Sequence, residues 1–194
     1  MKSKLTSITV GALFVALALI LAVSAVVSKE GAPVASGDRA KRGEKLVLVG
    51  GCNDCHTPKL YNAQGPYPDA ARLLSGHPNQ VKVPDIPVNV ITPTGWVAMT
   101  NADFTAWAGP WGLSYAANLT PDNVTGIGAW NEQVFINAMR TGKHMGAGRP
   151  ILPPMPWQGI GQLSDEDLKD IFAYLKSLKP VSNQVPPPVP PASH

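Results

Sequence analysis

The feature that most restricts this chain is the run Cys52-Asn53-Asp54-Cys55-His56, which holds both cysteines of the 194 residues. Two thiols separated by two residues can reach the two vinyl groups on one edge of a haem, and the next histidine is then held beneath the iron. We therefore predict one covalently attached haem c. Cys52 and Cys55 are the expected thioether residues, and His56 is the expected proximal ligand of the iron.

Two other chemistries also use closely spaced cysteines. A redox-active Cys-x-x-Cys pair usually lies at the start of a helix in a βαβ unit, whereas Gly50-Gly51 indicates that a helix ends just before Cys52. A structural zinc site needs four ligands, so His77 and His144 or a carboxylate would have to complete it at irregular spacings. Both interpretations fit the sequence less well than haem attachment.

The N-terminal segment predicts export. Two lysines precede an uncharged and mostly apolar stretch from Leu5 to Ser28, which as a helix can cross a hydrocarbon core of about 30 Å. Val23-Ser24-Ala25 is a tolerable cleavage pattern. We expect residues 1–28 to be either a cleaved signal peptide or an N-terminal membrane anchor. In both cases the remaining chain lies in the bacterial periplasm or at the outer face of the cytoplasmic membrane.

Composition divides the rest of the chain. Residues 29–37 are small and polar and predict a linker, residues 38–180 predict one domain, and residues 181–194 form a Pro-rich tail that we expect to be extended and poorly ordered. Charged residues make up only 15% of the chain and the net charge is +3, with two of the lysines in the leader. The sequence therefore predicts no basic surface for nucleic acid.

Hydrophobic periodicity predicts three helices separated by a long irregular segment. Prolines between residues 58 and 121 exclude a long helix there, and short extended pieces are expected at residues 81–83 and 88–91. We predict a mostly α-helical fold with three main helices around the haem and a long loop insertion. The expected N-caps and stops of the helices are Asp38 and Gly50, Asn131 and Gly142, and Ser164 and Pro180.

The second axial ligand is expected to be Met155. It lies in Pro153-Pro154-Met155-Pro156, where the prolines restrict the backbone, so that little further entropy is lost when the thioether is presented to iron. Met139 is expected to fill the core on a helix face, and Met99 lies in a loop without comparable support. The alternatives are His144, Met145, His77 and an open iron.

Further contacts of the haem are predicted from residue chemistry. The other ring N–H of His56 is expected to donate to a carbonyl, which fixes the tautomer, and the rigid carbonyl of Pro66 is the candidate. Apart from the possible ligand role of His77, His77 and His194 are expected at the surface. The candidate donors to the haem propionates are Asn118, Trp130, Arg140 and Arg149.

The order of an N-terminal helix, the haem motif, a loop region, a methionine loop and a C-terminal helix resembles the class I cytochrome c fold. Several stretches are similar to the cytochrome c subunits of bacterial membrane-bound dehydrogenases: residues 118–122, residues 125–130, Phe135, Ala138, Arg140 and Gly142, Pro154-Met155-Pro156, residues 163–168 and residues 173–175. The likeness covers about a third of the chain. It implies that Met155 is the distal ligand of the iron.

One feature departs from the resemblance: those subunits usually carry several haem motifs, whereas this chain has one. No role for residues 61–117 follows from the sequence. The resemblance implies an electron carrier, not an enzyme, whose redox partners are a dehydrogenase, a quinol-oxidising complex or a terminal oxidase. The alternatives are a haem enzyme or ligand sensor with an open or labile sixth position, and a non-catalytic structural subunit of a larger complex.

Overall fold

The computed structural model describes residues 36–86, 90–92 and 94–191. The predicted leader and most of the predicted linker lie outside these residues, as do residues 88 and 89 of one predicted extended piece. None of the helices within the described ranges combines the length and apolar character that crossing a membrane requires.

Three helices coincide with the predicted ones: α2 (Ser36–Val49), α4 (Glu132–Thr141) and α6 (Asp165–Ser177). The Asn131 side chain accepts from the Val134 N–H, and Ser164 accepts from the Asp167 N–H, so both predicted caps are confirmed. Asp38 lies inside the first turn of α2 and is not its cap. The sequence did not predict two short helices, α3 (Cys52–His56) and α5 (Trp157–Ile160).

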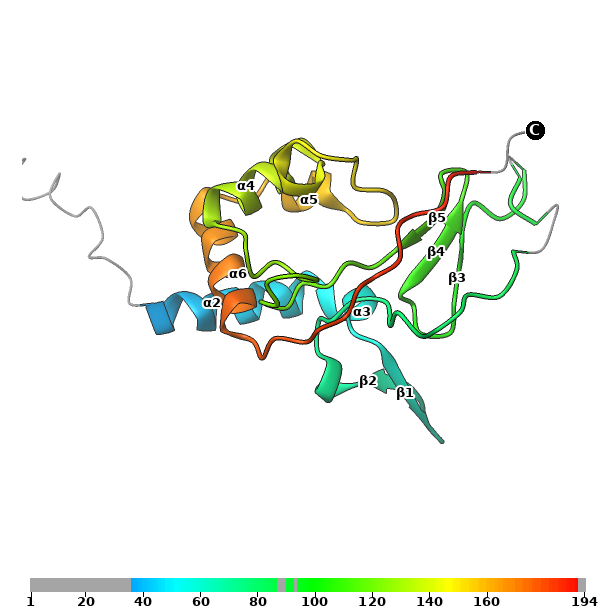
Figure 1. The fold of residues 1–194 in the computed structure, drawn as a ribbon, viewed down its shortest axis with the longest axis horizontal. Helices are drawn as coiled ribbons and strands as arrows, with labels where there is room; N and C mark the ends of the chain where they lie inside the picture. The colour runs from blue at the N-terminus through cyan, green and yellow to red at the C-terminus, as the bar shows by residue number, and fades with distance from the viewer. Residues whose placement is uncertain (1–35, 87–89, 93, 192–194) are drawn as a thin grey trace, which may run out of the picture. The chain divides into compact units, whose positions relative to one another are not determined.

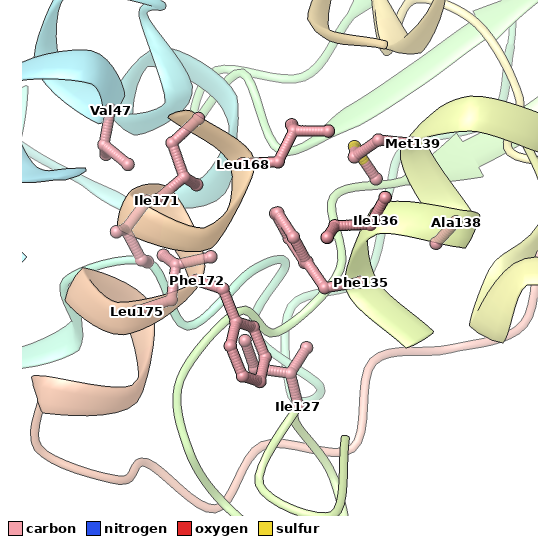
Figure 2. Packing of buried hydrophobic residues seen from close by; sticks show 11 residues of the cluster. Val47, Ile127, Phe135, Ile136, Ala138, Met139, Leu168, Ile171, Phe172 and Leu175 are labelled. Atoms are coloured by element: carbon pink, nitrogen blue, oxygen red, sulfur yellow. The ribbon is translucent and has the colours of Figure 1, made fainter. Parts of the chain in front are cut away.

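The main core lies where α6 packs against α2 and α4. The apolar positions of the three helices face one another there, and the rings of Phe135 and Phe172 lie 5.5 Å apart between centroids (Figure 2). This burial of apolar surface holds the three helices together. The buried members of the core are Val47, Leu74, Ile127, Phe135, Ile136, Ala138, Met139, Leu168, Ile171, Phe172 and Leu175.

The contact between α2 and α6 is unusually close at Gly43. A Cβ atom on Gly43 would lie 1.9 Å from the carbonyl oxygen of Asp170, so the two backbones touch without an intervening side chain. The Asp170 carboxylate is only 1% exposed and pairs with the guanidinium of Arg42 at 2.5 Å. The absence of a side chain at Gly43 therefore sets how closely the two helices approach.

The described residues of the predicted loop insertion form two small β-sheets. Strands β1 (Lys59–Asn62) and β2 (Gly65–Pro68) form an antiparallel hairpin. Strands β3 (Met99–Thr100), β4 (Ala106–Gly109) and β5 (Gly112–Tyr115) form an antiparallel sheet in that order. The domain is therefore partly helical, with more strand than the sequence predicts (Figure 1). Glycine and proline within these strands hide the alternation by which a strand is usually recognised.

The expected surface position of His77 is wrong, and the described residues of the two expected extended pieces form no regular strand. Residues 81–83 form no strand, and Ile91 makes only an isolated bridge with Trp96. His77 is fully buried. Its Nδ1 lies 2.8 Å from Thr105 Oγ1 and its Nε2 lies 3.0 Å from the Val81 carbonyl oxygen. The ring is buried because both of its nitrogens have hydrogen-bond partners inside the insertion.

The C-terminal segment is extended, as expected, but it is not loose. From the end of α6, residues 181–191 run beside the domain toward β5 (Figure 1). Asn183 is only 7% exposed, and Val189 forms a backbone bridge with Leu113 of β5. The expectation of poor order is wrong for residues 181–191. Side-chain hydrogen bonds from Asn183 hold one end of the segment, and backbone hydrogen bonds of Val189 hold the other.

Candidate haem site

The haem motif occupies α3, directly after α2. Gly51 joins the two helices in the left-handed conformation, with φ of 64°, which glycine adopts at little cost. Cys52, Cys55 and His56 all line one cavity of about 690 Å³, which is within the usual size range of cofactor sites. Residues of α4, residues 114–119, residues 151–156 and residues 184–188 supply most of the other walls.

Both cysteines are free thiols at half-buried positions on this cavity. Burial raises the pKa of the Cys52 and Cys55 thiols, and the nearby Asp54 carboxylate raises both further. The two side chains come from a single turn of helix, three residues apart. That placement is what two thioether bonds to one edge of a porphyrin require.

His56 is oriented by a backbone carbonyl. Its Nδ1 lies 2.8 Å from the oxygen of Ala117, and because a carbonyl only accepts, Nδ1 carries the proton and Nε2 keeps its lone pair. Burial lowers the pKa of His56, so the ring is neutral at pH 7, the form that ligates iron. The predicted role of Pro66 is wrong, because this exposed residue of β2 pairs with Tyr61.

Met155 is half-buried and lines the same cavity as His56. Two hydrogen bonds fix the backbone around it: its N–H donates to the Leu152 carbonyl at 3.3 Å, and its carbonyl accepts from the Trp157 N–H at 2.9 Å. The Ser114 hydroxyl of β5 donates to the Pro153 carbonyl at 2.6 Å. The insertion sheet thus supports the methionine loop, so the structure brings His56 and Met155 to one site.

The other sulfur candidates differ in their access to this cavity. Met139 of α4 lines it from within the core, where it is 7% exposed. Met145 is 52% exposed and is not among the lining residues. Met99 lines a separate, smaller cavity of about 220 Å³ within the insertion. Met139 is therefore the methionine that has to be compared with Met155.

The two histidines that are alternative iron ligands differ in whether they line the large cavity. His77 is not among the residues that line the large cavity, and its two ring nitrogens already face Thr105 and Val81. The structure therefore removes it as an alternative ligand. His144 is exposed and lines the cavity, with its ring edge-on to Trp130 at 5.2 Å between centroids.

The four expected propionate donors divide into two pairs. Trp130 and Arg149 line the cavity, so both remain candidate donors to the haem propionates. Arg140 is not among the lining residues, since its guanidinium donates to the Asp165 carboxylate at 2.6 Å and to the Gly161 carbonyl. It links α4 to the start of α6 and is no longer a candidate donor.

Asn118 lines the cavity, but its amide is used within the protein. Its Nδ2 donates to the Val181 carbonyl at 2.8 Å and to Thr125 Oγ1 at 3.2 Å. Its Oδ1 accepts from the N–H and the hydroxyl of Thr120. Because both N–H donors have partners, the predicted role as a propionate donor is wrong, and Asn118 instead joins two segments of the cavity wall.

Sequence reasoning missed one residue that supports the haem motif. The ammonium group of Lys59 donates to three carbonyls at the end of α3, those of Asn53 at 2.9 Å, Asp54 at 3.0 Å and Thr57 at 2.5 Å. Partial burial lowers the pKa of Lys59. The available signal was a cation just beyond the C-terminus of a short helix, where it satisfies free carbonyls.

Replacing Lys59 with methionine should lower the stability of the haem-bound protein by about 1–2 kcal/mol, because three carbonyls at the end of α3 lose a charged donor. Chemical denaturation followed by haem absorbance measures this change. Lys41→Met, at an exposed lysine of α2, is the control and should change stability by less than about 0.5 kcal/mol. Equal stability of both variants would show that Lys59 does not support α3.

The donor set of the cavity fits covalent haem. Two adjacent thiols, one neutral imidazole with a free Nε2 and a thioether face a space lined largely by apolar side chains. Imidazole and thioether are established axial donors to haem iron, and an apolar surround excludes water from such a site.

Comparisons with known proteins agree with this geometry. The family model described as "Cytochrome c" matches residues 40–179. The gluconate 2-dehydrogenase cytochrome c subunit of Pantoea cypripedii is 31% identical over 134 residues, which are 69% of this chain and 22% of that protein. The fructose dehydrogenase cytochrome subunit of Gluconobacter japonicus is 35% identical over 82 residues, 42% of this chain and 17% of that protein.

A third relative is a nicotinate dehydrogenase subunit of Pseudomonas putida, 38% identical over 86 residues, which are 44% of this chain and 7% of that protein. The matched part of this chain thus spans no more than 22% of the length of these three relatives.

Proposed function

The chain belongs to the cytochrome c family, which carries haem c covalently, and we propose that it is a single-haem electron carrier with His56 and Met155 as axial ligands. The observation that supports this most directly is that both side chains line the same cavity as the two cysteines of α3. When bound, haem c supplies a one-electron couple between ferric and ferrous iron. We also propose that α2, α4 and α6 are the main helices of the domain that surrounds it.

The protein's contribution is to hold the two ligands in place. The Ala117 carbonyl fixes the His56 ring, and hydrogen bonds on both sides of Met155, with Ser114 behind the loop, fix the backbone that carries the thioether. Because neighbouring groups position both side chains, little protein movement has to accompany a change in iron charge. Methionine ligation and an apolar cavity both favour the ferrous state and raise the reduction potential.

We propose redox partners of the dehydrogenase kind, because the relatives are named as subunits of gluconate, fructose and nicotinate dehydrogenases. A quinol-oxidising complex or a terminal oxidase would serve as the opposite partner. We further propose that residues 1–28 direct export or anchor the chain, that residues 29–37 are the linker, and that the haem domain at 38–180 works outside the cytoplasmic membrane. Trp130 and Arg149 are the proposed propionate donors.

The optical spectrum of protein matured in a periplasm with haem-attachment machinery tests the proposal. We expect sharp low-spin ferrous bands and the weak far-red band of methionine-ligated ferric haem. Mass spectrometry should show one haem that survives denaturation. A high-spin spectrum that responds to carbon monoxide would instead support a haem enzyme or sensor with an open sixth position. A low-spin spectrum without the far-red band would transfer the distal position from Met155 to His144.

A further inference from the structure

The C-terminal segment beyond the family match forms part of the haem cavity. The match to the cytochrome c family ends at residue 179, and Gln184, Val185, Pro186, Pro187 and Pro188 all line the cavity. We call residues 183–189 the strap. It is drawn in red in Figure 1, where the segment runs from the end of α6 to β5.

The first anchor of the strap is Asn183. Its side-chain Nδ2 donates to the carbonyls of Ser75 at 2.7 Å and His77 at 2.9 Å, while its Oδ1 accepts from the Asn79 N–H at 3.0 Å. Its backbone N–H donates to Thr125 Oγ1 at 3.0 Å. These bonds lie at a position that is 7% exposed, so they join the strap firmly to the insertion and to the loop before α4.

The second anchor is Val189, beside β5. The Leu113 N–H donates to the Val189 carbonyl at 2.8 Å, and the Val189 N–H donates to the Leu113 carbonyl at 2.9 Å. The close approach depends on Gly112, where a Cβ atom would lie 2.1 Å from the Val189 carbonyl oxygen. A glycine at this position is therefore required for the strap to dock.

The residues between the anchors are suited to form an apolar wall. Pro186, Pro187 and Pro188 have no backbone N–H, so burial against a cofactor leaves no donor unsatisfied. Consecutive prolines also hold an extended conformation without a sheet partner. Val185, Pro186 and Pro188 are half-buried on the cavity side of the domain.

We propose that the strap shields one side of the haem from water and from small redox reagents, and that it thereby directs electron exchange to the rest of the haem surface. This inference rests on the proposed electron-carrier function. An apolar wall disfavours the more highly charged ferric state, so the strap raises the reduction potential. Its removal should lower the potential and open an additional route for outer-sphere electron transfer.

Gly112→Ala tests the strap in the full-length, haem-bound protein. The added Cβ displaces Val189, and the positive φ of 91° adds local strain. The matched control is Gly65→Ala in the other hairpin, which has a similarly strained φ of 114° but no atom within 4 Å of the added Cβ. Val189→Pro is a second variant, because proline lacks the N–H that donates to Leu113 and its ring takes the place of that hydrogen.

Two readouts separate shielding from a merely structural role. The rate at which ferricyanide oxidises the ferrous protein should rise several-fold in Gly112→Ala and Val189→Pro, and the midpoint potential should fall. In both variants the far-red methionine band should remain. Gly65→Ala should keep the wild-type rate and potential. If Gly112→Ala yields no soluble holoprotein, Val189→Pro decides the outcome.

The proposal is overturned if the strap variants lose thermal stability but keep the wild-type exchange rate and potential. Failure of the proposed function gives a different result, because the wild-type protein would then lack the low-spin spectrum of methionine-ligated haem before any strap variant is compared.

Discussion

Replacing Met155 with leucine is expected to lower the reduction potential on the order of 0.1 V or more, since axial ligands set haem potentials over a range of about 0.8 V. Leucine keeps the volume and apolar character of methionine, so the packing cost should stay below about 1.5 kcal/mol. The variant should lose the far-red ferric band and bind carbon monoxide readily in the ferrous state. Redox titration and optical spectroscopy measure these changes.

Met139→Leu is the matched control for this experiment. Met139 lines the same cavity, but it is a buried member of the helical core. We expect this variant to keep the far-red band and a potential close to that of the wild type. If Met139→Leu loses the band and Met155→Leu keeps it, the distal ligand lies on α4. If both variants keep it, neither methionine ligates the iron.

Local patterns were sufficient to predict the three longer helices, α2, α4 and α6. The caps Asn131 and Ser164 act as predicted because a side chain and a backbone N–H three residues later meet wherever a helix begins. Gly142 ends α4 with φ of 64°, which few other residues tolerate. Helix α3 was missed because five residues are too few to show a period.

Sequence spacing also indicated the chemistry of the site, but it could not identify the groups that support it. The cysteines and His56 are neighbours in the chain, and the structure places them on one cavity with Met155. The carbonyl that orients His56 comes from Ala117, 61 residues away. Every residue has a carbonyl, so side-chain chemistry cannot single out the one that accepts from His56, and the rigidity of Pro66 says nothing about its distance from the ring.

The order of the strap likewise could not be predicted from the sequence. A Pro-rich end of a chain is usually assigned to disorder on composition alone. Here its order depends on distant partners, because Asn183 bonds to Ser75 and His77 more than 100 residues earlier. Only the tertiary fold brings such pairs together.

Among the glycines in the described part of the chain, Gly43 is the one at which an added Cβ would lie closest to another atom. It is buried on α2, and an added Cβ would meet the carbonyl oxygen of Asp170 at 1.9 Å and the Tyr174 Cβ at 2.9 Å. Both contacts belong to α6, and the nearer one is backbone, which cannot rotate away. Helix α2 leads directly into the haem motif, so displacing it also disturbs the position of Cys52.

Gly43→Ala is therefore expected to destabilise the haem-bound protein by about 3 kcal/mol or more, at the upper end of typical overpacking costs. The yield of holoprotein should fall, while the remaining folded fraction keeps the wild-type spectrum because no ligand is altered. Gly37→Ala is the matched control in the same helix, with no atom within 4 Å of the added Cβ. It should be neutral or stabilising by up to about 1 kcal/mol, since alanine favours the helix. Denaturant midpoints of the two variants measure the difference, and equal midpoints would show that α2 and α6 are not in backbone contact at Gly43.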